Sequence, residues 1–183
     1  FQRTGFDKER LFYTQGDFGL FQSSRPAGAS AGRTYDNEKS IRAMLAAQGF
    51  AFAEDGELLL PESGAPLMEI PAALIPYCPD DGAEMTTNLR ADERFVEDAG
   101  WHAAAARYED WLARSEGRRM LLLELGVGAN TPGIIKYPFW RMTAARADVT
   151  LAAINLGAYV PDEIRGRSIA LDGHIEEVLR ELL

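Results

Sequence analysis

The sequence predicts an α/β fold in which helices cover a parallel sheet, and two observations support this prediction. The second half of the chain alternates apolar runs with segments of helical periodicity, in the order strand, helix, strand, strand, helix. The run "RMLLLELGVG" at 119–128 is apolar and ends in glycines, which is typical of a strand buried on both faces of a parallel sheet. At 183 residues the chain is long enough for one such domain and a smaller module.

The first elements along the chain are short. Residues 10–22 alternate apolar runs with a Gly-Asp-Phe-Gly turn, so they predict a strand, a turn and a second strand. A flexible segment rich in small residues follows at 23–34. A helix is then expected at 36–49, because Asp36 or Asn37 can cap its start and a glycine can end it.

Residues 50–90 differ in composition from the rest of the chain. They carry several prolines and glycines between short apolar pieces such as "ELLLP", so they predict an irregular insertion that is not a layer of the core. The remaining elements are helices at 99–118, 138–147 and 174–183 and strands at 119–128, 149–157 and 168–173.

Composition limits the classes of partner. The formal net charge is −9 and the basic residues are scattered between acidic ones, which argues against a nucleic-acid ligand. No apolar run reaches the roughly 18 to 20 residues that a membrane span needs. A single cysteine, Cys78, excludes an internal disulfide and fits a reducing, cytoplasmic compartment.

Three loops follow the predicted parallel strands, and ligands of α/β sheets bind beyond the carboxyl ends of such strands. The loop "GVGANTPG" offers backbone N–H groups to a phosphate or ribose, and its Asn and Thr add side-chain donors. The asparagine of "NLGAY" can hydrogen-bond a ribose hydroxyl, and "DGHI" can seat an adenine edge on backbone amides. The candidate cofactor-binding residues are therefore Gly126, Val127, Gly128, Asn130, Thr131, Asn155, Leu156, His174 and Ile175.

Each of these loops also has a purely structural interpretation. A Gly-x-Gly turn can be a tight strand exit, Asn155 can be a turn former, and Asp172 with Gly173 can cap the last helix. The two histidines, His102 and His174, have no evident serine or cysteine nucleophile beside them, which argues against a hydrolase triad.

Five segments resemble the sirtuins, in the order that this family uses: "FYTQGDFGLFQ", "YCPDDGAEMTTNLRADERFVED", "LELGVGANTPGIIKYPFW", "INLG" and "DGHIEEVL". The similarity is strongest to the macrodomain-linked branch called class M, and "GVGANTPGIIKYPFW" is its most specific part. The resemblance implies a Rossmann-like NAD-binding domain at 1–22 and 90–183, with a small inserted zinc module at 23–89. It also implies that the phosphate loop and the catalytic Asn and Asp of the family precede Phe1, so we expect the chain to be truncated at its N-terminus.

The zinc module implied by the resemblance is expected to be degenerate. In sirtuins two thiol pairs bind a structural zinc ion in a tetrahedral site. The matching positions here are Ser23 and Ala27 for the first pair and Cys78 and Asp81 for the second. One thiol and one carboxylate do not make a closed zinc site, so we expect no zinc.

The resemblance places Gln15 where the family has a histidine general base. A carboxamide does not titrate near neutral pH, so Gln15 can orient a ribose hydroxyl but cannot take its proton. Class M sirtuins are similar in carrying Gln there. The alternative is that Gln15 is a structural residue of an inactive homologue. Phe95 and Val96 are placed in the substrate groove by the same analogy, with an ordinary core position as the alternative for Phe95.

The activity implied is transfer of ADP-ribose from NAD to a protein acceptor, with release of nicotinamide. Class M sirtuins are associated with lipoyl-carrier proteins as acceptors, so a lipoylated partner is expected. Three alternatives stay open: an NAD-dependent protein deacylase, which Gln15 disfavours, a free NAD hydrolase, and a non-catalytic sensor of NAD or ADP-ribose.

Overall fold

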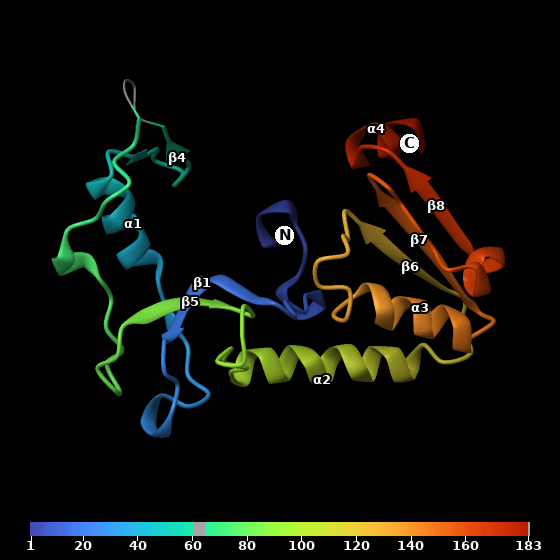
Figure 1. Cartoon of the computed structure of the whole chain (residues 1–183), viewed down its shortest axis with the longest axis horizontal. Helices are drawn as coiled ribbons and strands as arrows, with labels where there is room; N and C mark the ends of the chain where they lie inside the picture. The colour runs from blue at the N-terminus through green and yellow to red at the C-terminus, as the bar shows by residue number, and fades with distance from the viewer. Residues whose placement is uncertain (61–64, 183) are drawn as a thin grey trace. The chain divides into compact units, whose positions relative to one another are not determined.

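The computed structural model describes residues 1–60 and 65–182, and the chain forms two compact units (Figure 1). The first unit is Phe1–Tyr108 and the second is Glu109–Leu183. The α-helices are α1 (Glu38–Ala47), α2 (Ala99–Arg114), α3 (Lys136–Ala145) and α4 (Ile175–Leu182). The strands are β1 (Gly16–Ser23), β2 (Tyr35–Asp36), β3 (Ala51–Phe52), β4 (Leu58–Leu59), β5 (Met85–Leu89), β6 (Met120–Leu125), β7 (Val149–Asn155) and β8 (Ser168–Asp172). Short 3-10 helices lie at Gln2–Thr4, Lys8–Arg10, Gly28–Ser30, Ala72–Leu74 and Asp162–Arg167.

The second unit is built on a parallel sheet of order β6-β7-β8. The three strands correspond to the apolar runs of the sequence, and α3 connects β6 to β7. Apolar side chains of α3, among them Phe139 and Met142, pack against a core that includes Leu122 and Leu151. This arrangement confirms the predicted α/β class with a parallel sheet.

The prediction that the first of these strands is buried on both faces is wrong. Along β6 burial alternates, so that Met120 and Leu122 are buried while Leu121, Leu123 and Leu125 are exposed. The physical reason is that α3 packs on the face of β6 that carries Met120 and Leu122, whereas the described residues leave Leu121, Leu123 and Leu125 on the opposite face exposed. The central strand β7 pairs on both sides, and its Leu151 is fully buried.

The first unit contains an antiparallel sheet of order β2-β1-β5. The predicted strand, turn and strand at 10–22 is corrected here, because one strand begins at Gly16 and its register with β5 shifts between Asp17 and Phe21. Gly16 has a φ of +100°, and a Cβ there would lie 2.0 Å from the Asn88 carbonyl oxygen. The glycine therefore permits a close approach to β5 instead of forming a hairpin turn.

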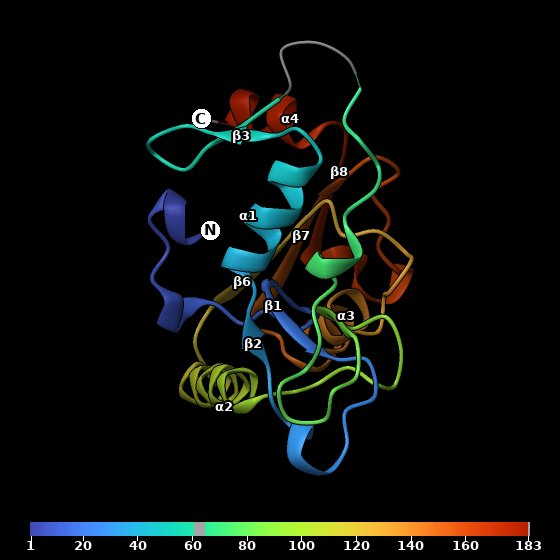
Figure 2. The same ribbon diagram turned by 90° about the vertical axis from the view of Figure 1, so that its left-hand side faces the viewer.

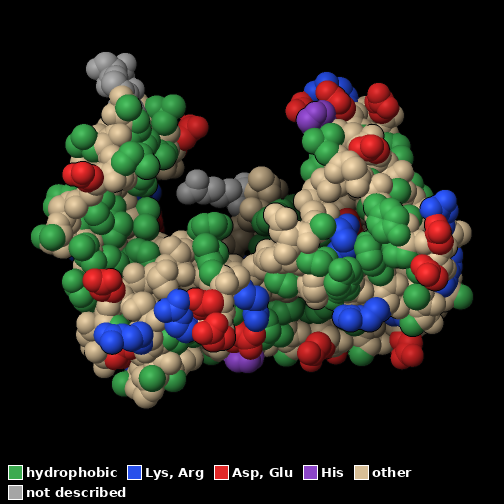
Figure 3. Space-filling view, viewed as in Figure 1, with side chains coloured by type: hydrophobic (Ala, Val, Ile, Leu, Met, Phe, Trp, Pro, Cys, Tyr) green, Lys and Arg blue, Asp and Glu red, His purple; other side chains and the backbone are tan. Residues whose placement is uncertain are grey.

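The stretch predicted as an irregular insertion contains three short strands, so that prediction is corrected in part. β3 and β4 form a hairpin beside the end of α1, and the Arg42 guanidinium lies 4.5 Å from the centre of the Phe52 ring (Figure 2). β5 pairs with β1 and belongs to the main sheet of its unit. Figure 3 shows apolar side chains gathered over α1 and this hairpin, where Leu58 and Leu59 are exposed.

The helix predicted at 36–49 is present as α1, but its N-cap residue Asn37 makes no side-chain capping hydrogen bond. The Asp36 carboxylate accepts a hydrogen bond from the backbone N–H of Glu38 at 3.1 Å. The Asn37 side chain instead donates to the Phe18 carbonyl. Gly49, with a φ of +92°, follows the helix as predicted. Over the described residues, no helix has both the length and the apolar character needed to cross a membrane.

Candidate functional site

The turns that follow β6, β7 and β8 lie together at the carboxyl edge of the parallel sheet. The backbone N–H of Gly126 donates to the Ile154 carbonyl at 2.9 Å, which joins the first turn to the second strand. The backbone N–H of Gly173 donates to the Asn155 carbonyl at 3.3 Å, which joins the third turn to the second. The loops singled out in the sequence therefore share one edge, as parallel strands require.

Asp172 ties two of these turns together. Its carboxylate accepts a hydrogen bond from the backbone N–H of Gly157 at 2.8 Å, across from β8 to the turn after β7. The first bond inside α4 runs from the Val178 N–H to the His174 carbonyl. Asp172 thus fixes the spacing of the loops at the strand ends.

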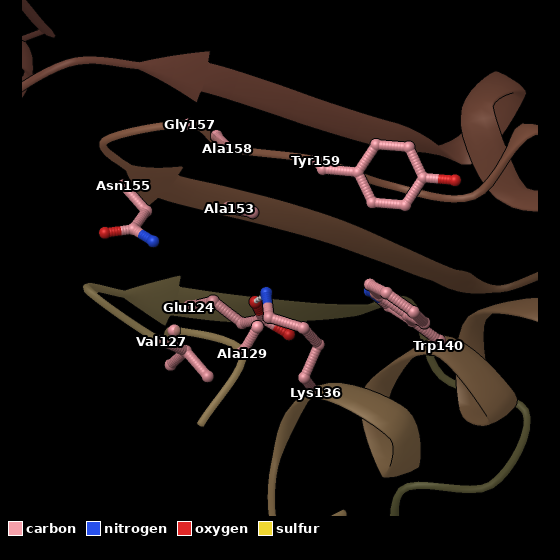
Figure 4. A pocket seen from close by; sticks show the side chains of 11 residues that line it. Glu124, Val127, Ala129, Lys136, Trp140, Ala153, Asn155, Gly157, Ala158 and Tyr159 are labelled. Carbon is pink, nitrogen blue, oxygen red and sulfur yellow. Dashed lines mark hydrogen bonds and ion pairs between the residues drawn. The ribbon is translucent and has the colours of Figure 1, made fainter. Parts of the chain in front are cut away.

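A pocket of about 130 Å³ opens at this edge (Figure 4). Ligand sites for drug-sized molecules measure roughly 300–1,000 Å³, so this pocket fits a fragment the size of one sugar or ring. It is lined by Glu124, Val127, Gly128, Ala129, Lys136, Trp140, Ala153, Asn155, Gly157, Ala158 and Tyr159. In Figure 4 Lys136 and Trp140 project from α3, and Asn155 lies at the end of β7.

Part of the predicted cofactor set lines the pocket, namely Val127, Gly128 and Asn155. Gly126 and Ile175 lie next to each other, since a Cβ on Gly126 would be 3.2 Å from the Ile175 Cδ1 atom. The other predicted residues are exposed and do not line this pocket: Asn130, Thr131, Leu156 and His174. The role of all nine residues in cofactor binding stays a prediction.

A buried ion pair in the pocket wall was missed by the sequence analysis. The Lys136 ammonium lies 2.7 Å from Glu124 Oε2, and the two side chains are 12% and 1% exposed. Glu124 Oε1 and Trp140 Nε1 are buried and have no hydrogen-bond partner among the described residues. The sequence did contain an indication of this pair, because Glu124 is a single carboxylate inside the apolar run "LLLELG". Burying a charge in such a run costs free energy unless the charge is paired.

Gln15 lies in the first unit, where a turn before β1 is held from several sides. Its carbonyl accepts the backbone N–H of Arg90 at 2.9 Å, and the Arg90 side chain donates to the Thr14 carbonyl. The same guanidinium stacks 4.4 Å from the centre of the Phe95 ring. The Gln15 side chain is exposed, and its backbone is fixed by these contacts.

Phe95 and Val96 lie close to this turn, in the segment after β5. Val96 is buried, its backbone N–H donates to Gln22 Oε1, and its carbonyl accepts from the Asn88 side chain, both at 2.9 Å. The buried pair Gln22 and Asn88 is itself hydrogen-bonded, so it fixes this segment against the sheet. A peptide that paired with the Val96 N–H would have to displace the Gln22 carboxamide. The substrate-groove role stays a prediction.

The positions aligned with zinc ligands form a hydrogen-bonded cluster. Ser23 and Ser30 both donate to Asp81 Oδ2, at 2.7 and 2.5 Å, and both serine residues are fully buried. Ala27 is aligned with a zinc ligand, but its side chain does not contribute to the cluster. Ser30 contributes instead, and its hydroxyl accepts a hydrogen bond from the Ala27 backbone N–H at 3.1 Å. The buried Cys78 thiol donates to the Tyr35 hydroxyl at 3.3 Å.

These hydrogen bonds perturb the acid–base chemistry of the cluster. The Ser30 hydroxyl, the Ala83 N–H and the Ser23 hydroxyl hold the pKa of Asp81 well below its usual range. The hydrogen bond that the Tyr35 hydroxyl donates to the Asp80 carboxylate raises the pKa of Tyr35 well above its usual value. The same hydrogen bonds therefore favour the ionised form of Asp81, which can accept all of them.

The residues of this cluster do not fit a zinc ion. Zinc in proteins is bound by thiolates, imidazoles and carboxylates, whereas two of the four aligned positions here carry hydroxyls or a methyl group. Over residues 1–60 and 65–182 there is no group of three or more His, Cys, Asp or Glu side chains that could hold a metal ion. The hydrogen bonds to Asp81 join the segments that a metal would otherwise join. The absence of zinc stays a prediction.

The pocket lies at the carboxyl edge of the parallel sheet, beside the turns that contain Gly128 and Gly157, and this edge is where α/β units of this type bind their ligands. No protein-family model matches the chain. A protein ADP-ribosyltransferase from Staphylococcus aureus (strain Mu50 / ATCC 700699) is 34% identical over 185 aligned residues, which cover 100% of the chain and 52% of that protein. A probable bifunctional ADP-ribose hydrolase/ADP-ribosyltransferase from Fusarium oxysporum f. sp. cubense is 32% identical over 117 residues, or 60% of the chain and 19% of that protein. The chain thus spans about half the length of the bacterial relative.

Proposed function

We propose that the whole protein is a sirtuin-like, NAD-dependent protein ADP-ribosyltransferase, which moves ADP-ribose from NAD to a protein and releases nicotinamide. One observation carries the proposal: a pocket at the carboxyl edge of a parallel sheet, in a chain similar along its whole length to a protein ADP-ribosyltransferase. Val127, Gly128 and Asn155 line that pocket and would contact the dinucleotide.

The proposed reaction exchanges one bond at ribose C1′ for another and needs no metal ion for this exchange. The bond between ribose C1′ and the nicotinamide nitrogen breaks, and its electron pair leaves with neutral nicotinamide. A nucleophile of the acceptor forms a bond to C1′ and gives up its proton. Gln15 would orient the ribose, which lowers the barrier by positioning. Since a carboxamide does not accept a proton near neutral pH, the proton passes to solvent or to the acceptor's own groups.

The acceptor in this proposal is a protein, and a lipoyl-carrier protein is the candidate that the class M resemblance favours. The resemblance rests on "GVGANTPGIIKYPFW" and on Gln15. This segment forms the loop after β6 and the start of α3, and several of its residues line the pocket of the second unit. We also propose a cytoplasmic location, which fits a chain with one buried thiol.

The test incubates the whole protein with NAD labelled in its adenylate part, together with lipoylated and unmodified forms of a carrier protein. Label on the lipoylated carrier is the expected result, and Gln15→Ala should reduce it at least about tenfold if a positioning contact is lost. Free labelled ADP-ribose without labelled carrier would indicate a hydrolase. Deacylation of an acyl-lysine peptide would indicate a deacylase, and binding without turnover would indicate a sensor.

Asp17→Asn is the matched control for Gln15→Ala. Asp17 lies two residues after Gln15, at the start of β1, and its side chain accepts a hydrogen bond from the Gly19 N–H. Both variants should keep the thermal stability of the parent within a few degrees. Labelling that is unchanged in Gln15→Ala would overturn the role given to Gln15.

A further inference from the structure

The wall of the pocket contains a charged residue in an unusual setting. Glu124 is the fifth residue of a strand whose other inward-facing side chains, Met120 and Leu122, are apolar and buried. Its carboxylate is 1% exposed, and one oxygen is paired with Lys136 at 2.7 Å. Burying an ion pair costs more free energy than an apolar pair of similar size in many proteins, so its presence in the wall calls for a reason other than stability.

Two polar atoms of this wall lack partners. Glu124 Oε1 is an acceptor and Trp140 Nε1 is a donor, and both are buried without a hydrogen bond among the described residues. More than nine in ten buried polar groups in proteins are hydrogen-bonded, so two such atoms on one pocket are exceptional. Both residues line the pocket together with Lys136, whose ammonium lies 5.6 Å from the centre of the Trp140 ring.

The polar atoms of this wall favour one type of ligand group. Glu124 Oε1 is an acceptor, the Lys136 ammonium is a charged donor and Trp140 Nε1 is a neutral donor, and all three residues line the same pocket. The charges of Glu124 and Lys136 cancel within their ion pair. A neutral group that both donates and accepts can satisfy them, and a hydroxyl does so with one O–H and two lone pairs. An anion would meet Glu124, and a cation would meet Lys136, so the wall favours an uncharged polar ligand.

The carboxylate can reach such a ligand without breaking the ion pair. The last torsion of a glutamate side chain is broad, so the carboxylate can turn one oxygen toward the pocket while the other keeps Lys136. Figure 4 shows the ends of Glu124 and Lys136 beside each other, between Ala129 in the loop after β6 and Trp140 on α3. The volume of about 130 Å³ accommodates one sugar ring and not a whole dinucleotide.

We propose that Glu124, Lys136 and Trp140 form a subsite for a ribose of ADP-ribose, in which Glu124 accepts a hydrogen bond from a ribose hydroxyl and Trp140 or Lys136 donates to it. This inference rests on the proposed function for the identity of the nucleotide. It adds a ribose subsite formed by β6 and α3 to the turn residues that the sequence predicted.

The experiment measures the affinity of the whole protein for ADP-ribose and for analogues that lack one ribose hydroxyl at a time, by isothermal titration calorimetry. A hydrogen bond to a charged group contributes about 1.5–3 kcal/mol, so one deoxy analogue should bind about 10- to 150-fold more weakly. In Glu124→Gln the difference between this analogue and ADP-ribose should shrink to about 2- to 10-fold, because the neutral amide oxygen accepts a weaker hydrogen bond than the carboxylate does. Trp140→Phe, which removes the N–H donor together with part of the indole ring, should weaken ADP-ribose binding about 2- to 10-fold.

Asp148→Asn is the matched control. It removes a carboxylate that pairs with Arg146 in the same unit, and neither residue lines the pocket. Its affinities for ADP-ribose and the analogues should equal those of the parent. A thermal melt of each variant identifies unfolding, and the comparison of analogues on the unmodified protein needs no variant.

Each outcome decides between the two proposals. Equal binding of all analogues, or the same loss in Glu124→Gln as in the parent, would overturn the ribose subsite and leave the transferase proposal standing. Suppose that one deoxy analogue binds the parent more weakly, that Glu124→Gln reduces this difference, and that no label is transferred. This result would keep the subsite and overturn the transferase proposal. If the parent does not bind ADP-ribose at all, both are wrong.

Discussion

Replacing Lys136 with methionine should destabilise the second unit, because it leaves the Glu124 carboxylate without its partner. The ammonium is 2.7 Å from Glu124 Oε2, and the carboxylate is 1% exposed. Removing one member of a buried ion pair costs roughly 3–5 kcal/mol. Lys136 is 12% exposed, so water can partly replace it, and we expect a loss near the lower limit, about 3 kcal/mol. Urea unfolding followed by far-UV circular dichroism measures this free energy.

The double variant Glu124→Leu with Lys136→Met separates the charge effect from the packing effect. Replacing both partners with apolar residues of similar size is often neutral or stabilising. The double variant should therefore recover most of the stability lost in Lys136→Met. If it is as unstable as the single variant, the loss comes from packing against α3 and the reasoning about an unpaired charge is wrong.

Three further predictions concern the first unit. Gly16→Ala should cost more stability than Gly32→Ala in a thermal melt, because both glycines have positive φ but only at Gly16 would the Cβ clash, 2.0 Å from the Asn88 carbonyl oxygen; equal losses would contradict this. Hydrogen bonds lower the pKa of Asp81, so its contribution to stability is complete above the ordinary carboxyl pKa of about 4 and is lost as the pH falls through the folded value. Ser30→Ala should flatten that acid branch in circular dichroism, and an unchanged branch would exclude the role of the Ser30 hydroxyl. Elemental analysis should find no zinc, and one zinc ion per chain would refute the degenerate module.

The parallel sheet could be predicted from the sequence because its strands are long apolar runs and its helices have clear periodicity. β6, β7 and β8 lie within the predicted ranges, α4 lies within the helix predicted at 174–183, and α3 overlaps the helix predicted at 138–147 but begins two residues earlier. The first unit was harder to predict. β5 has the polar sequence "MTTNL", and it forms a strand because it pairs with β1, which is a tertiary effect that local pattern does not carry.

The loops of the candidate site could be located from strand ends, but the chemistry of the pocket wall could not. Val127, Gly128 and Asn155 follow strands and were singled out for that reason. Glu124 and Lys136 are twelve residues apart and meet only because α3 folds back over β6. The Ser30 hydroxyl was missed for a similar reason, since its partner Asp81 lies 51 residues further along the chain.

A crystal structure of the whole protein with ADP-ribose bound tests the central claim most directly. The nucleotide should lie across the turns after β6, β7 and β8, with a ribose hydroxyl within hydrogen-bond distance of Glu124 Oε1. A nucleotide bound elsewhere on the chain, with these turns in contact only with solvent, would contradict the account.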